Sequence, residues 1–188
     1  MIVKCKGFTI GKFKIPPFEL NEGELLRIYL CSGGGFLELE KELVKLFTGE
    51  RNIPELEIHH DLTFVDRIKE SKLRSIFFPM TVEKYIKHKG KPDSDISNRI
   101  YQIDDFIKPK TKIITLPGNH MKWLSLLTVF SKSNKIIFDL LGQDPLGVEK
   151  TLGLVNESII RGGSAILLDN FDDLETKSDK FIRAEKID

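Results

Sequence analysis

The chain has 188 residues, of which 40% are hydrophobic and 30% are charged, and its formal net charge is +1. This composition is typical of a globular protein with an adequate core, and the near-neutral charge argues against a nucleic-acid partner. No apolar run approaches the ~20 residues of a membrane-spanning helix, so we expect no direct membrane insertion. The two cysteines, Cys5 and Cys31, lie in strand-like runs and predict free thiols.

The first quarter of the chain predicts strands, a glycine turn and a helix. Residues 1–10 and 13–20 alternate apolar and polar side chains, as the strands of a small antiparallel sheet do. An apolar strand is predicted over 25–31 and a helix over 36–47, with Ser-Gly-Gly-Gly at 32–35 between them. A strand, a glycine turn and a helix N-terminus are the parts of a phosphate-binding loop. A plain turn before an ordinary helix is an equally good interpretation of this stretch.

The turn does not satisfy the sequence rule of such loops, GxxxxGK(S/T), because Phe36 stands at the lysine and Leu37 at the serine or threonine. The lysine neutralises the outer phosphates and the hydroxyl holds magnesium, and neither phenylalanine nor leucine can do so. Three glutamates follow, and we expect them to occupy the positive end of the helix dipole and to repel a triphosphate. They are Glu38, Glu40 and Glu42.

The middle of the chain predicts a short strand and then helices joined by polar linkers. Residues 62–65 read as a short buried strand. An apolar loop over 76–82 leads to a helix that starts at Val82 and is capped by Thr81. The later elements are a polar linker over 88–97, a short helix over 98–107, a turn over 116–120 and a helix over 121–131.

The last third of the chain alternates strands with helices. The predicted elements are a strand over 135–139 that ends in Asp139, a helix over 148–160, a strand over 164–168, an acidic loop over 169–173, a turn or short helix over 171–178 and a final strand over 180–186. Alternation of this kind predicts a mainly parallel sheet with right-handed crossovers. We interpret the acidic residues of the loop as a solvated helix cap; they are Asp169, Asp172 and Asp173.

Taken in order, these segments resemble the nucleotide-binding domain of ABC transporters. The segments that carry the resemblance are FELNEGE (18–24), LTFVDR (62–67), FPMTVEKY (78–85), LPGNHMKWLS (116–125), KIIFD (135–139), DPLG (144–147) and SAILLDNFD (164–172). In that family they correspond to the strand before the phosphate loop, the Q-loop and the segment after it, the LSGGQ signature, the Walker B strand, the D-loop and the switch-histidine strand. Asp139 and Asp144 lie about two residues closer together than the family pattern has them.

The resemblance implies an α/β fold of one domain over 1–188: a mainly parallel P-loop NTPase-type sheet flanked by helices, a small N-terminal antiparallel β-subdomain, and a reduced helical insertion over about 82–131. It also locates departures from the family pattern. Arg67 replaces the Q-loop glutamine, Leu140 stands where the catalytic glutamate belongs, and Pro117 replaces the signature serine. Phe171, or Asn170 in a shifted frame, stands at the switch histidine.

From these departures we expect no catalytic residues and no metal site. No cofactor is expected either, and binding of ATP with magnesium is doubtful. Asp139 is the one member of the hydrolytic set that remains, and a degenerate nucleotide site would consist of Gly33, Gly34, Gly35 and Asp139. The expected function is that of a non-catalytic ABC-type (pseudo-ATPase) subunit in an ABC transport complex. Two alternatives stay open: a divergent but functional ATP-binding subunit, and a self-associating structural protein of the same fold.

The resemblance also implies surfaces for partners. An apolar loop, Phe77, Phe78, Pro79 and Met80, stands where the family docks a membrane permease subunit. The signature segment would lend Gly118, Asn119 and His120 to a second ATPase subunit, although Pro117 has neither a hydroxyl nor an N–H for a phosphate. A homodimer is a further option. The expected location is cytoplasmic, at the inner face of the cell membrane. Each surface also has a purely structural interpretation. The apolar loop would fold into the core, and the signature segment would be only a helix-initiating turn.

Overall fold

The computed structural model describes residues 1–31, 33–69, 77–92, 94–171 and 178–187, and their contacts divide the chain into two units. The first unit comprises Met1–Phe64, Asn134–Leu141 and Val155–Asp188. The second comprises Val65–Ser133 and Gly142–Leu154.

A five-stranded sheet forms the centre of the first unit, and all its strand pairs are parallel. The strand order is β10-β5-β9-β8-β7. The bounds are β5 (Leu25–Tyr29), β7 (Thr63–Phe64), β8 (Lys135–Phe138), β9 (Ser164–Asp169) and β10 (Lys180–Arg183). Every residue of β5 and β9 is buried, as strands in the middle of a parallel sheet must be. The predicted mainly parallel sheet is confirmed.

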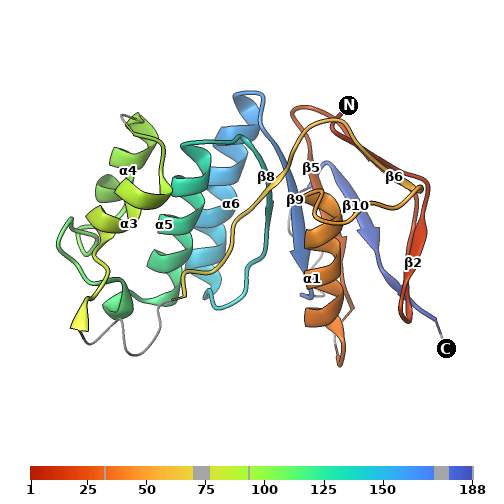
Figure 1. The fold of residues 1–188 in the computed structure, drawn as a ribbon, viewed down its shortest axis with the longest axis horizontal. Coiled ribbons are helices and arrows are strands. Elements are labelled where there is room, and N and C mark those ends of the chain that lie inside the picture. The colour runs from red at the N-terminus through yellow and green to blue at the C-terminus, as the bar shows by residue number, and fades with distance from the viewer. Residues whose placement is uncertain (32, 70–76, 93, 172–177, 188) are drawn as a thin grey trace. The chain divides into compact units, whose positions relative to one another are not determined.

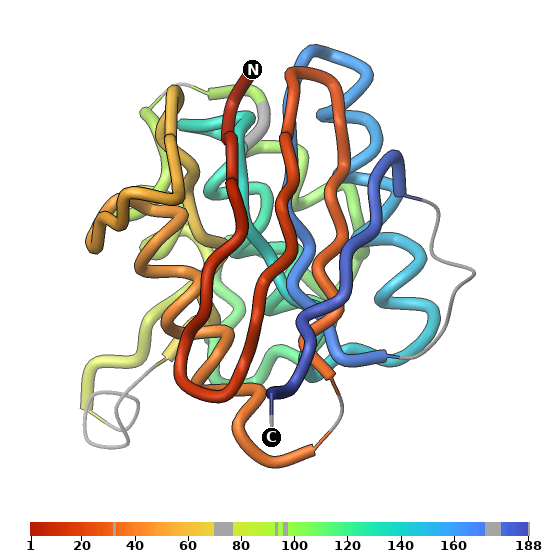
Figure 2. Tube along the Cα trace, turned by 90° about the vertical axis from the view of Figure 1, so that its right-hand side faces the viewer, coloured from red at the N-terminus to blue at the C-terminus, as the bar shows by residue number. Residues whose placement is uncertain are grey.

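Two small antiparallel sheets accompany it, with strand orders β4-β1-β6 and β11-β3-β2. The bounds are β1 (Val3–Cys5), β2 (Phe8–Ile10), β3 (Phe13–Ile15), β4 (Phe18–Leu20), β6 (Leu56–Ile58) and β11 (Glu185–Lys186). Figure 2 shows the N-terminal strands, in red and orange, beside the C-terminal strands, in blue, and β3 pairs directly with β11. The predicted N-terminal antiparallel β-subdomain is confirmed, although sequence reasoning missed β6.

The predicted single strand over 180–186 is wrong. The chain leaves the parallel sheet after Arg183 and joins an antiparallel sheet at Glu185. Between them lies the fully buried Ala184, whose N–H donates to the Tyr29 carbonyl at 2.8 Å. A short side chain there lets the strand turn from one sheet to the other, and a pattern of alternation alone does not reveal such a turn.

Helix α1 (Phe36–Phe47) has the bounds that the sequence predicts (Figure 1). Its leucines at helical spacing, Leu39, Leu43 and Leu46, are buried in the same core cluster as Leu26 and Ile28 of β5. This amphipathic helix therefore covers the strand that it follows, and that packing fixes where the glycine turn between them lies.

Helices make up most of the second unit (Figure 1). They are α3 (Val82–Lys89), α4 (Asp95–Ile103), the 3-10 turn η1 (Ile113–Thr115), α5 (Gly118–Phe130) and the first part of α6 (Pro145–Ile160), whose last part belongs to the first unit. The Thr81 side chain accepts from the N–H of Lys84, so the predicted cap of α3 is confirmed. Helices α4, α5 and α6 each begin about three residues earlier than predicted.

Candidate functional site

The glycine turn between β5 and α1 has a backbone that few residue types adopt. Cys31, Gly33 and Gly35 have φ values of 65°, 125° and 97°. These lie in the left-handed region, where glycine has no Cβ to collide with the backbone. Gly33 and Gly34 are exposed, and a Cβ added to either would have no heavy atom within 4 Å. The sequence placed this turn correctly, and it is open.

The N-terminus of α1 is capped by a glycine. Gly35 is the N-cap residue, with ψ of −5°, and it has no side chain that could accept from the first-turn N–H groups. Phe36 is half-buried and packs against the core cluster, whereas Leu37 is exposed. The aromatic ring of Phe36 is therefore part of the core of the first unit. Neither residue supplies a cation or a hydroxyl.

Two of the three glutamates lie elsewhere than expected. Glu42 forms ion pairs with Lys45 at 2.7 Å and with Arg51 at 2.8 Å, which direct its carboxylate away from the start of the helix. Glu40 is only 7% exposed. Glu38 alone is exposed and in the first turn. The expectation of three carboxylates around the turn is thus wrong for Glu40, which points to a different helix face from Glu38, and for Glu42, which lies one helical turn further along.

An aromatic ring that sequence reasoning missed lies beside the turn. Two ring carbons of Phe13, from β3, are 3.5 Å from the point where a Cβ of Gly35 would be. The sequence predicts Phe13 only as part of an alternating strand, because no local pattern reveals a contact between residues 13 and 35. The turn therefore has exposed backbone at Gly33 and Gly34 and an aromatic neighbour at Gly35.

Asp139 follows β8 and is buried. One of its carboxylate oxygens accepts from the N–H of Leu141 at 2.8 Å. The next residue, Leu140, is buried as well and offers no polar atom at the position after the carboxylate. Asp139 thus caps the turn that leaves β8, and this structural use needs no ligand.

A buried ion pair joins β5 to the end of β9. Arg27 donates from Nε and Nη2 to the two carboxylate oxygens of Asp169 at 2.8 and 3.2 Å, and Nη2 also donates to the Phe171 carbonyl at 2.8 Å. Burial raises the pKa of the Asp169 carboxyl, and the Arg27 guanidinium lowers it in part. The interpretation of Asp169 as a solvated cap is wrong; its loop companions Asp172 and Asp173 lie outside the described residues.

In the second unit, α5 begins at Gly118 inside the predicted turn, with Pro117 as its N-cap residue. The turn is tightly packed. A Cβ on Gly118 would come within 2.4 Å of the Gly142 carbonyl oxygen. The Asn119 side chain lies against Gly147 and accepts from the N–H of Asp144 at 3.3 Å. Asp144 in turn caps α6, because its side chain accepts from the N–H of Gly147 at 2.8 Å.

His120 lies in the first turn of α5, among aromatic and charged neighbours. Its Nε2 is 3.3 Å from a carboxylate oxygen of Asp104, and its ring centroid is 5.6 Å from that of Phe106 and 5.0 Å from that of Trp123. The pKa of Asp104 is held below its usual range, first by the donated N–H of Phe106 and then by His120. Lys150 lies over the Trp123 ring at 4.9 Å. The side chain of His120 therefore has partners within its own unit.

No protein-family model matches the chain, and no curated protein matches it either. Solved structures do. A protein assigned as a metal-chelate type ABC transporter, in an inward-facing conformation, matches with a TM-score of 0.73 and 17% identity over 98% of this chain and 80% of that one. A protein from Pyrococcus furiosus, assigned as the ATP-binding protein of an ABC transporter, matches with a TM-score of 0.71 and 13% identity over 97% of each chain. The cbiO1 protein from Clostridium perfringens, part of the ABC transporter complex cbiONQ, gives 0.68 and 15% over 98% and 84%.

The chain has the fold of an ABC transporter ATP-binding domain. The predicted fold class is thereby confirmed over almost the whole chain, whereas identities this low establish the fold alone. In this ABC-type fold, the glycine turn, Phe36 and Asp139 belong to the first unit, and Gly118, Asn119 and His120 belong to the second. The part of the chain that is described contains no group of three histidine, cysteine or acidic residues that could hold a metal ion.

The apolar loop is largely at the surface of the second unit. Phe77 is 68% exposed and Phe78 is 80% exposed, whereas Pro79 and Met80 are half-buried. The interpretation that this loop folds into the core is therefore wrong for the two phenylalanines. Phe77 and Phe78 are adjacent in the chain, and a contiguous exposed apolar patch often marks a contact site. None of the described helices is both long enough and apolar enough to cross a bilayer.

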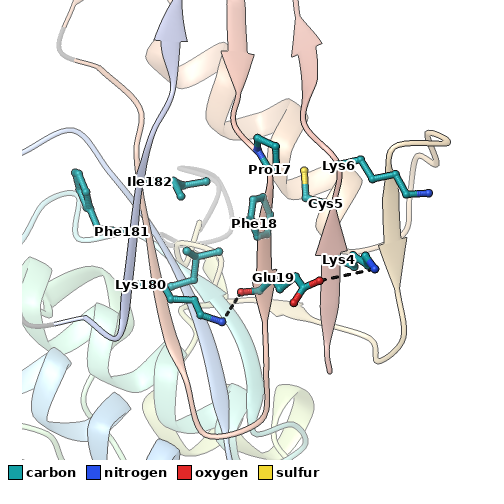
Figure 3. Close-up of a pocket in the computed structure, with 10 residues that line it drawn as sticks. Lys4, Cys5, Lys6, Pro17, Phe18, Glu19, Lys180, Phe181 and Ile182 are labelled. Carbon is teal, nitrogen blue, oxygen red and sulfur yellow. Dashed lines mark hydrogen bonds and ion pairs between the residues drawn. The ribbon is translucent and has the colours of Figure 1, made fainter.

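An open groove of about 720 Å³ lies beside β1, β4 and β10 in the first unit (Figure 3). Cys5, Phe18 and Ile182 contribute apolar atoms to its lining. Three lysines also line it, and each has a carboxylate partner: Lys4 with Glu19, Lys6 with Glu57 and Lys180 with Glu24, at 3.8, 3.0 and 2.7 Å. Each of the three lysine charges is therefore balanced by a carboxylate, and the lining does not include the glycine turn.

Proposed function

We propose that this chain is a non-catalytic ABC-type subunit, a pseudo-ATPase, that acts through a partner in an ABC transport complex. The fold supports the ABC-type assignment. The observation that supports the lack of catalysis is the start of α1, where Phe36 and Leu37 follow the glycine turn and bring neither a cation nor a hydroxyl. The site that remains consists of Gly33, Gly34, Gly35 and Asp139.

The chemistry of phosphoryl transfer explains why these positions matter. The protein contributes positioning and electrostatic stabilisation to that reaction and little covalent chemistry. Removing one preorganised charge or donor typically lowers the rate by about 10²–10³. Such losses do not simply multiply, because the groups act as a unit. With the lysine, the metal-binding hydroxyl and the glutamate after Asp139 all replaced, we propose that the chain neither hydrolyses ATP nor has a resident cofactor.

A phosphate-release assay on the purified chain tests this proposal. We expect no release above that of the buffer with ATP and magnesium. Release that disappears in the Asp139→Asn variant would overturn the proposal, because it would come from this site. Release that is identical in the wild type and the variant would come from a contaminating ATPase. Asp139 is buried, so a thermal melt of the variant must accompany the assay.

A divergent nucleotide-binding subunit is the second candidate, and the open glycine turn favours it. Gly33 and Gly34 are exposed, and the N-cap Gly35 leaves the first-turn N–H groups of α1 to other acceptors. Calorimetry with ATP and magnesium separates the candidates, since a micromolar Kd would favour this one. Gly34→Asp should abolish such binding by charge repulsion, and Gly34→Asn is the neutral control. Both changes fit the open space around Gly34.

The partners belong to the same proposal. We propose that Phe77, Phe78, Pro79 and Met80 contact a membrane permease subunit, and that Gly118, Asn119 and His120 contribute to contacts with a second ATPase subunit or a second copy. The location proposed is the cytoplasm, at the inner face of the membrane. The high exposure of Phe77 and Phe78 supports the first contact. The contacts of His120 within its own unit leave mainly the backbone at Gly118 for the second.

A pull-down with the tagged chain, followed by identification of the captured proteins, tests the permease contact. Phe78→Asp should remove the captured partner and leave the thermal melt almost unchanged. Ile160→Asp is the matched control, because Ile160 is 85% exposed and lies at the end of α6. Equal capture by all three proteins would contradict the contact, and a collapsed melt for Phe78→Asp would show a structural role.

A further inference from the structure

Two segments of the second unit lie side by side and expose aromatic, aliphatic and basic side chains. The N–H of Ile113 donates to the Met80 carbonyl at 2.9 Å, and Thr81 and Lys112 form an antiparallel bridge. The N–H groups of Val82 and Glu83 donate to the carbonyls of residues 111 and 109, both at 3.0 Å. We give the name basic–aromatic surface to seven of the exposed residues of these two segments, among which Glu83 is also exposed: Phe77, Phe78, Lys84, Lys108, Lys110, Lys112 and Ile114.

Positive charge is concentrated around this surface. Residues 77–91 and 105–114 contain seven lysines and two acidic residues, which leaves 22 basic and 26 acidic residues for the rest of the chain. A chain of nearly zero net charge is thus strongly basic in one place. Within the part of the chain that is described, none of the four lysines of the surface forms an ion pair. Their charges are therefore available to a ligand.

Exposed apolar side chains accompany these charges. Phe77 and Phe78 are 68% and 80% exposed, and Ile114 of η1 is 54% exposed. The hydrogen bonds between the two segments hold the apolar residues near the lysines. A ligand that contacts the whole surface must therefore provide negative charge for the lysines and an apolar environment for the exposed apolar side chains.

The choice of basic residue distinguishes between ligands of this kind. Interfaces between proteins are enriched in arginine and depleted in lysine. All seven basic residues of these segments are lysines. Lysine with exposed phenylalanine is the combination that binds the surface of an anionic bilayer, where the ring enters the boundary of headgroups and acyl chains and the ammonium groups remain at the phosphates.

We propose that the basic–aromatic surface binds directly to an anionic lipid bilayer, as a peripheral contact that does not span it. The contact needs no protein partner, and because it uses Phe77 and Phe78 it is an alternative to the permease contact proposed above. It would hold the second unit against the membrane through lipid headgroups, with Lys108, Lys110 and Lys112 at the phosphates and Phe77 and Phe78 in the interface.

Vesicle sedimentation with the purified chain tests the proposal. Vesicles of phosphatidylcholine with phosphatidylserine should bind the chain, pure phosphatidylcholine vesicles should bind it much more weakly, and added salt should weaken the binding. Replacing Lys108, Lys110 and Lys112 by Gln should weaken binding roughly 100-fold, at about fivefold for each lysine near the surface. Replacing Phe77 and Phe78 by Ser should weaken binding but leave its salt dependence.

The control removes the same charge from the first unit. Lys12, Lys41 and Lys186 are exposed, and replacing them by Gln should change binding by no more than about threefold, because distant charges are screened. Equal binding to both kinds of vesicle, or equal losses in both triple variants, would overturn the proposal. So would lysine-dependent binding of an acidic amphipathic peptide without binding to vesicles. A pull-down that still depends on Phe78 would then leave the proposed permease contact standing.

Discussion

The chain begins two of its helices at glycine-containing turns, and the two turns use glycine for different reasons. Before α1, Gly33 and Gly35 have positive φ values, and the space around Gly33 and Gly34 is open. Before α5, Gly118 has no positive φ, but a Cβ there would meet the Gly142 carbonyl oxygen at 2.4 Å. The first turn needs glycine for its backbone conformation. The second needs glycine because the backbone at residue 142 comes too close to leave room for a Cβ.

The difference bears on function. An open turn with exposed backbone is able to meet an anion even where the side chains beside it supply neither a cation nor a hydroxyl. At the second turn, neighbouring side chains fill the available space, as Asn119 does at Gly147. The role of this turn is therefore mainly structural. Glycine substitutions can separate conformation from space at the two turns, and changes at Asn119 and Asp144 test the hydrogen bonds of the second turn.

Gly118→Ala should have the largest effect. The new methyl group would overlap a backbone oxygen that cannot move independently, and overpacking of this kind lowers the free energy of unfolding by about 1–3 kcal/mol. Urea unfolding measures it. The matched control is Gly153→Ala in α6, where a Cβ has no neighbour within 4 Å and alanine favours the helix. If both variants unfold like the wild type, the second turn is looser than described.

Gly35→Ala should come next. Its Cβ would meet only ordinary contacts with Phe13, so the expected loss of about 1–2 kcal/mol in unfolding free energy comes from the left-handed φ of 97°. Gly34→Ala, one residue earlier and without a positive φ, should change stability by less than about 0.5 kcal/mol. Equal losses in the two variants would show that conformation does not decide this turn.

Asn119→Ala should lower the unfolding free energy by about 1 kcal/mol, the usual net worth of one hydrogen bond, because it removes the acceptor for the Asp144 N–H. A double-mutant cycle with Gly147→Ala sharpens the test. A Cβ on Gly147 would collide with the Asn119 side chain, so Asn119→Ala should relieve part of the damage done by Gly147→Ala. Strictly additive effects would contradict the contact.

Asp144→Asn should have the smallest effect, and the effect should depend on pH. The N–H of Gly147 lowers the pKa of the Asp144 carboxyl in the folded chain. A lowered folded pKa stabilises above the unfolded pKa, and this stabilisation is lost as pH falls through the folded pKa. The advantage of the wild type over the variant should therefore shrink from about pH 5 to about pH 3. Thermal melts across this range, with the same advantage at every pH, would refute it.

Much of the fold could be predicted from local patterns. The apolar run of β5 and the spacing of Leu39, Leu43 and Leu46 gave the strand and the helix around the first turn, and Thr81 gave the start of α3. The failures lie where tertiary contacts decide. Helix α5 extends back to Gly118 because that residue allows close approach to the loop at Gly142, and nothing in the local sequence signals this contact.

The candidate site shows the same division. The glycine turn and Asp139 follow from their place after buried strands. The partners of Asp169 and Glu42 do not, because each is decided by a residue that the chain brings in from elsewhere: Arg27, 142 positions away, and Arg51, 9 positions away. A charged residue inside an otherwise apolar strand, as Arg27 is in β5, was the one signal that could have predicted a buried acidic partner.

That arginine has a consequence for how the chain is made. Strand β5 is synthesised well before both of its neighbours in the sheet, β9 and β10, which begin at Ser164 and Lys180. Until the ribosome has released Asp169, the guanidinium of Arg27 has no carboxylate to enter the interior with, and a lone buried charge is strongly unfavourable. Strand β5 can therefore be buried in the sheet only after β9 has been synthesised.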